Sequence, residues 1–497
     1  MTPDPGSSVS RRSLLRAGGV TAGALGTLAM LEKLAWIPER IAIADDVQAL
    51  PDIQFDIGAF CPPARTIDGL LVGMPPIHTV FLTAGLSRAP SRADQGRMES
   101  AIRKIESVYP YASGGIFTHV AYSNTYFNRL PSTVVNGAMP RTLSGNQPVL
   151  KPAIPGPTDV AAGNREMELR RPEFRVPVRI ETNDLMFTVR GDDSSYVADV
   201  VGWLSGSNRL QGQAVTSPKF DAGMRITSSR AMFVQMGLPR NVAYSNNLPF
   251  EGSVNPFSPM WMGFADQQVN ASAPPADVTF LGAHGIKLTN ATAGSYFDNG
   301  AMQHLSHVLL DLQQFYLDGR EPDDPDEDHR EPFDERLQYM FESPSQVQQN
   351  DSDPFRDGGG PRSKGTIGAF LPNVFHGAGY ARQSAQQFER MGHLSQLHRT
   401  GRTSDGRPIH LRIDGPGFDA MDTTTGRNTP KLQFSGFFPS ADFFADLRRS
   451  QASVDLLQEF DLEEEDHGIE RFITATRRQN FLIPPRRHRA FPLVELT

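Results

Sequence analysis

The sequence predicts an α+β fold built from short antiparallel strands. Short runs of β-branched and aromatic residues, such as TVFLTA at residues 79–84, indicate strands. Between these runs lie segments whose apolar residues recur at helical spacing. Strand–helix–strand units of this kind are typical of α+β proteins. The 39 prolines and 44 glycines among 497 residues also indicate many loops.

Two strand–helix–strand cycles are expected in the first half of the chain. In the first, a helix lies between two strands and has Met98, Ile102 and Ile105 on one side. In the second, Asp192 and Asp193 cap the start of the helix. The expected bounds are strand 79–84, helix 91–109 and strand 114–122, then strand 184–189, helix 194–204 and an extended segment at 232–237.

The second half is expected to continue with helices and strands on either side of an acidic insertion. Residues 318–361 contain EPDDPDEDHREPFDE, and this acidic, proline-broken composition is typical of a solvated segment. Ser440 is a plausible cap for the helix that follows Pro439. The other expected elements are helix 301–316, helix 385–397, strand 409–413, helix 439–447 and strand 480–483.

The start of the chain resembles an export signal. Arg11 and Arg12 precede a mildly apolar Gly/Ala/Leu-rich run, which is typical of the twin-arginine (Tat) pathway for folded proteins. Ala42-Ile43-Ala44 offers small residues for cleavage, so the signal is placed at residues 1–44. The alternatives are an uncleaved anchor, or a basic tail followed by a short helix. We expect Tat export to the periplasm or the extracellular space.

The composition argues against several classes of function and of metal site. The net charge of −8 argues against nucleic-acid binding, which requires a basic face. Cys61 is the only cysteine, which excludes internal disulfides, iron–sulfur clusters and multi-cysteine zinc sites. A metal or cofactor must therefore rely mainly on His, Asp or Glu.

Residues 261–270 (WMGFADQQVN) are the first candidate site. Gly263 permits a tight backbone, Phe264 is an apolar plug, and Asp266 is an acid beside it. A carboxyl group against aromatic surface tends to have a raised pKa, which suits proton transfer. The alternative is that Asp266 simply forms a turn.

Residues 389–414 are the second candidate site and contain three of the twelve histidines. His393 lies on the expected helix, and His398 follows it. On the expected strand, His410, Arg412 and Asp414 share one face because side chains alternate with a period of two. A neutral imidazole is a good iron ligand, and an arginine nearby can stabilise a developing anion. The alternative is an ordinary surface or core histidine.

A third candidate is the pair His304 and His307, which an expected helix would place on one side as metal ligands. No acidic partner lies at useful spacing, so a structural role is favoured, as it is for His284. The basic run at residues 486–489 is expected to be a solvated end.

Taken together, these stretches resemble the dye-decolorizing (DyP-type) haem peroxidase family. Gly263-Phe264-Ala265-Asp266 is similar to the family's distal Gly-x-x-Asp-Gly motif, although Gln267 replaces its last glycine. His393 fits the proximal ligand of haem b iron, and Arg412 fits the distal arginine. Asp414 stands where the family often has a polar Asn.

The resemblance implies two ferredoxin-like domains of the dimeric α+β barrel type, at residues 50–250 and 251–497, with haem held by the second. Asp266 and Arg412 would be catalytic, while Phe264, Asp414 and Glu470 would lie beside the haem. Glu470 would accept the N–H of the His393 imidazole and raise its basicity. The implied substrates are hydrogen peroxide and an organic reductant, and assembly into a homo-oligomer stays open.

Two other functions stay open. Gln267 favours a haem-binding protein of the same fold with weak or no peroxidase activity. A cofactor-free exported interaction protein is the third option. A hydrolase is disfavoured because the sequence has no Gly-x-Ser-x-Gly elbow, HExxH motif or nucleotide loop.

Overall fold

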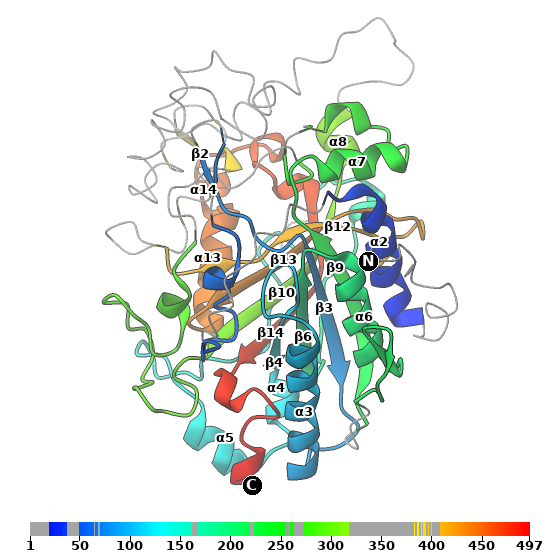
Figure 1. Ribbon diagram of the computed structural model, residues 1–497. Coiled ribbons are helices and arrows are strands. Elements are labelled where there is room, and N and C mark those ends of the chain that lie inside the picture. The colour runs from blue at the N-terminus through cyan, green and yellow to red at the C-terminus, as the bar shows by residue number, and fades with distance from the viewer. Residues whose placement is uncertain are drawn as a thin grey trace, which may run out of the picture.

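The computed structural model has a long, curved antiparallel sheet with helices packed on its outside (Figure 1). Its description covers residues 19–36, 49–63, 65–67, 70–161, 167–218, 223–254, 256, 258–262, 272–317 and 408–497, with isolated residues at 382, 385, 386, 389, 391–393, 396 and 399. The predicted α+β fold with antiparallel strands is confirmed.

The first half contributes four strands in the order β4-β6-β3-β9. Helix α3 connects β3 to β4, and helix α6 connects β6 to β9. This β-α-β-β-α-β order, with the first and third strands paired at the centre, is the ferredoxin-like topology. The bounds are β3 His78–Gly85, α3 Arg92–Val108, β4 Phe117–Tyr122, β6 Leu185–Gly191, α6 Ser194–Leu204 and β9 Arg225–Phe233.

The second half repeats this topology. Strands β11 and β12 both pair with β13, which pairs with β10, which pairs with β14. Helix α13 leads from β13 towards β14, as α6 leads from β6 to β9. The bounds are β10 Ala301–Leu310, β11 Leu411–Arg412, β12 Gly415–Asp419, β13 Thr429–Phe438, α13 Ala441–Ala452, α14 Val454–Glu459 and β14 Ile473–Ile483.

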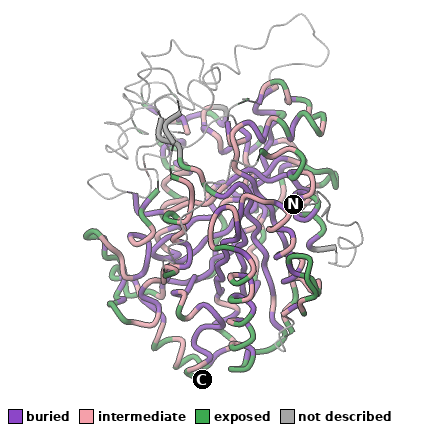
Figure 2. Tube along the Cα trace, in the orientation of Figure 1, coloured by how far each residue is buried: buried purple, intermediate pink, exposed green. Residues whose placement is uncertain are grey.

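The two halves share one sheet. Strand β14 pairs with β4 through Leu482 and Tyr122. At the other end of the sheet β12 lies against β9, and a side chain at Gly417 would come within 3.1 Å of the Ala231 carbonyl oxygen. The sheet therefore curls towards a barrel, with helices on its outer face (Figure 1), and most of the central chain is buried (Figure 2).

Shorter elements complete the described chain. Helix α2 lies against α6 and β9, and the remaining helices and strands connect or flank the two halves. Their bounds are α2 Gly19–Leu34, β1 Arg65–Ile67, β2 Leu70–Val72, α4 Asn124–Phe127, α5 Ser132–Ala138, β5 Arg179–Ile180, β7 Arg209–Leu210, β8 Gln213–Ala214, α7 Leu238–Ser245 and α8 Leu312–Leu317.

Most predicted elements form for local reasons. Ser91 caps α3 in a reciprocal capping box with Asp94, which satisfies backbone N–H groups at the helix start. Asp193 caps α6, and Ser440 caps α13. These three caps stand where the sequence predicts helix starts.

The predicted helix at residues 301–316 is wrong. The chain forms strand β10 to Leu310 and only then the short helix α8. Strand β10 is central, paired with both β13 and β14, and every residue in it is buried. A strand with two buried faces carries apolar residues on both, so Leu305, Val308 and Leu309 imitate helical spacing.

The predicted export signal contains a helix that packs against the rest of the fold. Leu25, Leu28 and Leu31 of α2 are buried, and the Thr27 hydroxyl donates to the Phe418 carbonyl at 2.9 Å. No described helix is long and apolar enough to cross a membrane. Arg11 and Arg12 lie outside the described residues, as does the predicted cleavage site, so Tat export stays a prediction.

The basic run near the C-terminus is not a solvated end. The guanidinium groups of Arg486 and Arg489 both bind Glu106, and Arg489 also binds Glu99 of α3. These ion pairs hold the last residues, among them the buried Phe491, against the first ferredoxin-like half. The acidic insertion at residues 318–361 lies outside the described residues.

Candidate haem-binding site

A buried ion pair between Glu470 and Arg448 lies at the centre of the candidate site. Glu470 begins the short 3-10 helix Glu470–Phe472 just before β14, and Arg448 reaches it from α13. Arg448 donates from Nη1 to Glu470 Oε1 at 2.9 Å and from Nη2 to Oε2 at 2.6 Å. Thr158 donates its hydroxyl to Glu470 Oε2. The parallel guanidinium–carboxylate contacts fix the orientation of Glu470.

Glu470 is ionised despite its burial. Burial alone would raise its pKa, but Arg448, His467 and the Thr158 hydroxyl lower the pKa to about 2. The same pair raises the pKa of the Arg448 guanidinium, because Glu470 more than offsets the effect of burial. The site therefore holds a permanent negative charge beside a permanent positive one.

His393 lies within the electrostatic influence of this pair. Burial and the positive charge of Arg448 lower its pKa to about 4, and the negative charge of Glu470 partly opposes them. The imidazole is therefore neutral at pH 7, which is the form that binds iron. His393 is thus within electrostatic reach of Glu470, the carboxylate that the sequence assigned to the same side of a haem.

The loop before β14 positions the helical turn that contains His393. The Met391 N–H donates to the Asp466 carbonyl at 2.9 Å, and the Gln396 N–H donates to the Gly392 carbonyl at 3.1 Å. Gly468 has a φ of +58°, and a side chain there would lie 2.6 Å from Gln396 Oε1. Glycine therefore allows the turn to approach the loop.

Arg412 and Asp414 lie on the same side of the chain, as predicted. Arg412 Nε is 4.0 Å from Asp414 Oδ1. Arg412 pairs with Gly436 of β13, and Gly436 pairs with His304 of β10. Directly opposed residues of antiparallel strands project from the same face. Arg412 is therefore on the His304 face of the sheet.

Helix α13 covers this same face. The His304 ring stacks on Phe444 of α13 with ring centroids 3.8 Å apart. His410, which the sequence placed with Arg412, is buried, and its carbonyl accepts from the Ala273 N–H at 2.8 Å. Arg412, the Arg448–Glu470 pair and α13 are thus all on the outer face of the second half.

Most of the first candidate site, residues 261–270, is not part of the described chain. Phe264, Asp266 and Gln267 lie outside the described residues, as does His398. The loop is anchored at its start, where the buried Trp261 indole donates to the Gly417 carbonyl at 3.0 Å. Asp266 as a proton carrier stays a prediction.

His304 and His307, for which the sequence favours a structural role over metal binding, do not lie on one side of a helix as expected. Both lie on β10, where residues three apart project from opposite faces. His304 contacts Asn480 and Ser306, whereas His307 contacts Gln433 inside the curled sheet. The described residues contain no group of three or more His, Cys, Asp and Glu side chains that could hold a metal ion.

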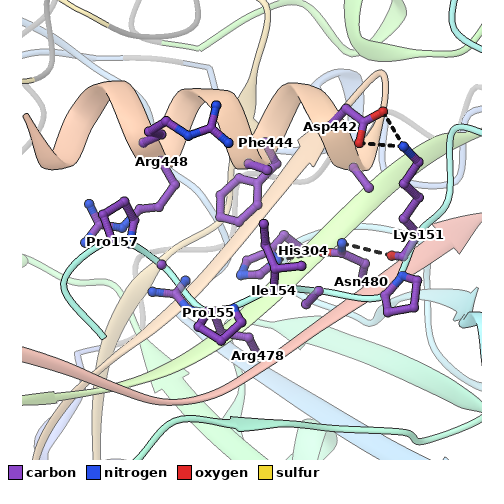
Figure 3. A pocket seen from close by; sticks show the side chains of 16 residues that line it. Lys151, Ile154, Pro155, Pro157, His304, Asp442, Phe444, Arg448, Arg478 and Asn480 are labelled. Carbon is purple, nitrogen blue, oxygen red and sulfur yellow. Dashed lines mark hydrogen bonds and ion pairs between the residues drawn. The ribbon is translucent and has the colours of Figure 1, made fainter. Parts of the chain in front are cut away.

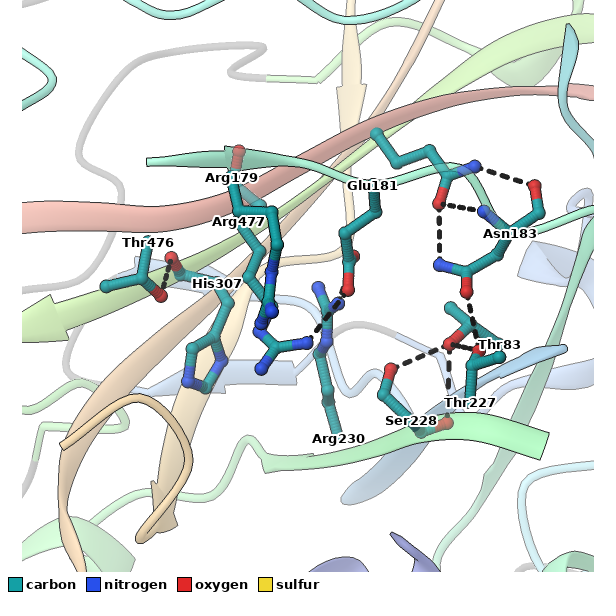
Figure 4. Close-up of polar contacts among 12 residues, drawn as sticks. Thr83, Arg179, Glu181, Asn183, Thr227, Ser228, Arg230, His307, Thr476 and Arg477 are labelled. Atoms are coloured by element: carbon teal, nitrogen blue, oxygen red, sulfur yellow. Dashed lines mark hydrogen bonds and ion pairs between the residues drawn. The ribbon is translucent and has the colours of Figure 1, made fainter. Parts of the chain in front are cut away.

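A second charged cluster lies inside the curled sheet (Figure 4). Glu181 binds Arg230 and accepts from Arg477 at 3.1 Å, and Arg477 also binds Asp422 at 2.6 Å. Strand register places Arg477 opposite His307, on the inner face of the sheet. These charges balance one another, so the cluster explains how a polar interior is stabilised and is separate from the His393 site.

Sequence reasoning missed Arg448, Thr158 and Arg478. Arg478 on β14 binds Asp159 at 2.6 Å, directly beside Thr158 in the chain. With Asp159, these residues come from three separate segments, so no spacing in the sequence connects them. The one available signal was Phe444 and Arg448 at i,i+4, which share a face of α13.

The described donors fit a haem better than a bare metal ion. A porphyrin supplies four nitrogens to its iron and needs a single protein ligand on one side, whereas a protein-bound zinc ion needs three or four. A single neutral His393 next to an ionised carboxylate meets the first requirement. The carboxylate has acceptor capacity beyond its bonds to Arg448 and Thr158 and can receive an imidazole N–H.

Comparison with known proteins gives one family. A model described as a family of unknown function (DUF7405) matches residues 76–152 and 164–485. No curated protein matches the chain.

Several solved structures are similar at low identity. DyPB from Rhodococcus jostii RHA1 is 12% identical with a TM-score of 0.45, over 83% of this chain and 94% of that one. A variant of DypB in complex with heme is 13% identical with a TM-score of 0.45, over the same shares. The encapsulated DyP-type peroxidase from Mycobacterium smegmatis is 12% identical with a TM-score of 0.42, over 85% of this chain and 96% of that one.

Proposed function

The chain belongs to the DUF7405 family, whose function is unknown, and we propose that it is an exported haem-dependent peroxidase. The proposed reaction uses hydrogen peroxide to oxidise an organic donor. The observation that carries the proposal is the neutral His393 beside the buried Glu470–Arg448 pair. The motif order Asp266, His393 and Arg412 in the sequence supports it.

The haem b would supply the iron at which the O–O bond of hydrogen peroxide breaks. His393 would bind the iron through one ring nitrogen and donate the N–H of the other towards Glu470. Arg448 would keep Glu470 ionised and in place, so that the imidazole remains strongly basic. Phe264 would exclude water from the opposite side.

Asp266 and Arg412 would handle the peroxide. The Asp266 carboxylate would accept a proton from one peroxide oxygen and return it to the other. The Arg412 guanidinium would stabilise the negative charge that develops as the O–O bond lengthens, and Asp414 would orient that guanidinium. Overall, peroxide is reduced to two waters while the donor loses two electrons and two protons.

The test is the absorption spectrum of the purified full chain after haem loading, with and without peroxide. A Soret band and peroxide-dependent oxidation of a dye are expected. His393→Ala should lose the haem, whereas His284→Ala should keep it, because the His284 side chain is 65% exposed and binds Asp277. Full haem occupancy in His393→Ala would exclude His393 as the ligand, and His398 would replace it.

Other results of these measurements would support one of the two alternative functions, a haem-binding protein or a cofactor-free interaction protein. Arg412→Ala should keep the haem and lose most dye oxidation. A Soret band without peroxide-dependent oxidation in the unaltered chain would select a haem-binding protein, as Gln267 favours. The absence of haem binding would select a cofactor-free interaction protein.

Tat export is a separate part of the proposal. Arg11→Lys together with Arg12→Lys should retain the protein in the cytoplasm, because the Tat route requires the arginine pair. Fractionation of cells that express the two forms measures this. Export of the double variant at the normal level would contradict it.

A further inference from the structure

A small cavity lies between α13, the outer face of β10 and β14, and the loop at residues 151–157 (Figure 3). Its volume is about 110 Å³. A cavity of about 150 Å³ accommodates benzene, so this one suits a ligand of a few heavy atoms. It is too small for a haem and is not explained by the proposed peroxidase chemistry.

The cavity walls combine positive charge with apolar surface. Lys151, Arg448, Arg449 and Arg478 line it, against a single acid, Asp442. The rest of the lining is mostly apolar and rigid, with prolines from the loop on one side and Phe444 from α13 on another (Figure 3). A mostly apolar pocket with a few convergent charged groups is typical of a small-molecule site.

Two of the cations are held rigidly by acids behind them. Arg478 is 5% exposed; it binds Asp159 through Nε and Nη2 and donates from Nη1 to Ser306. Arg448 is 12% exposed and binds Glu470. The bonds of each guanidinium to described residues leave it with further N–H groups for a ligand. Because their partners fix them in place, these donors are organised before any ligand binds.

The loop at residues 151–157 is anchored close to these arginine donors. The Asn480 side-chain amide donates to the Lys151 carbonyl at 3.0 Å, which anchors the loop to β14. A side chain at Gly156 would lie 2.9 Å from Arg478 Nη2, so glycine permits the close approach. At the rim, Lys151 Nζ binds Asp442 at 2.8 Å, and both side chains are partly exposed. Lys151 can therefore exchange this contact for a ligand.

We propose that this cavity binds a small organic monocarboxylate. The guanidinium groups suit a carboxylate oxygen, and the proline and Phe444 walls suit a short apolar tail. Inorganic phosphate has the charge but no apolar part, so it should bind worse. The proposal goes beyond the proposed peroxidase and does not require it, because the side chains that line the cavity need no haem iron to bind a carboxylate.

The test compares melting temperatures of the haem-free full chain in sodium acetate, propionate, phosphate and chloride at equal ionic strength. Acetate and propionate should stabilise the protein saturably relative to chloride, and phosphate should not. Equal melting temperatures in acetate and chloride would overturn the proposal. Stabilisation by phosphate alone would also overturn it.

Two variants locate the binding. Ala445→Leu fills the cavity from α13 without removing a charge and should abolish the acetate effect. Lys151→Met should weaken acetate binding about tenfold, which is a loss of about 1.4 kcal/mol. Lys104→Met, on α3 in the other half, is the matched control and should bind acetate normally. Unchanged binding in Ala445→Leu would place the ligand elsewhere and overturn the proposal.

Haem loading separates this proposal from the peroxidase. Acetate should stabilise the haem-loaded chain as it does the haem-free chain. Loss of the effect on loading would mean that the cavity takes the carboxylates of the haem itself, which overturns a separate site. If the chain binds no haem, the haem-free measurement still decides the matter.

Discussion

The two ferredoxin-like halves have the same strand order but fill the space between sheet and helices differently. In the first half, the outward side chains of β3 and β6 are apolar, among them Leu82 and Phe187, and they pack against α3 and α6. In the second half, the corresponding face of β10 and β14 carries His304, Arg478 and Asn480, and α13 adds Arg448.

The chain segments that connect the first and second strands of each half also differ in length. The first crossover of the first half runs from β3 through α3 to β4 in residues 86–116, whereas that of the second half occupies residues 311–410 and contains His393. A close-packed apolar layer has no room for chemistry. The second half instead fills the layer with charges, each of which needs its partner, and this is the half that contains the proposed haem site.

The largest effect is expected from breaking the charged layer. Glu470→Ala leaves the Arg448 guanidinium buried without its carboxylate and should lower the free energy of unfolding by about 4 kcal/mol. Urea unfolding measures this. Glu459→Ala removes an exposed partner of Arg382 and should cost less than about 1 kcal/mol. Equal losses in the two variants would mean that burial of the Glu470 pair has no energetic consequence.

Acidification should also weaken the charged layer. Burial lowers the pKa of His304 to about 3 and that of His393 to about 4, below the usual 6.5. The unfolded chain therefore binds more protons between pH 6.5 and these values, so stability falls as pH falls through this range. Between pH 6.5 and pH 4.5, the range that the measurement below covers, each histidine should contribute roughly 3 kcal/mol, at about 1.4 kcal/mol per pH unit.

Urea unfolding at pH 7.0 and pH 4.5 measures the pH effect. His304→Leu should show a smaller loss between the two pH values than the unaltered chain. His284→Ala serves as the control, because this ring is mostly exposed. An identical pH dependence in His304→Leu would show that His304 is not the neutral, buried group described above.

The apolar half should respond to lost volume instead of lost charge. Leu82→Ala creates a cavity between β3 and its helices and should cost about 3 kcal/mol, with little dependence on pH. Leu82→Met keeps most of the volume and should cost less than about 1.5 kcal/mol. Haem content should be unchanged in both. Loss of haem in Leu82→Ala would show that the halves are not independent in function.

The smallest effect is expected at the start of α3. Ser91→Ala removes the capping box with Asp94 and should cost about 1 kcal/mol in thermal unfolding. Ser107→Ala, near the other end of the same helix, removes only an exposed bond to the Lys104 carbonyl and should cost less. A larger loss in Ser107→Ala would contradict the role of the cap.

Local signals in the sequence were sufficient for much of the fold. The starts of α3, α6 and α13 follow from a Ser or Asp cap before a periodic apolar stretch, since capping involves residues close in the chain. Strand β10 could not be predicted, because its two buried faces are defined by β13 and β14, which lie far away in the sequence.

The candidate site divides in the same way. The sequence by itself determined the α+β class, the caps and the order of His393, Arg412 and Asp414, because residue type and spacing carry that information. Only the tertiary structure decided that Glu470 pairs with Arg448 and that burial keeps His393 neutral. The reason is physical: partners and desolvation depend on segments that meet only when the sheet closes and α13 packs on it.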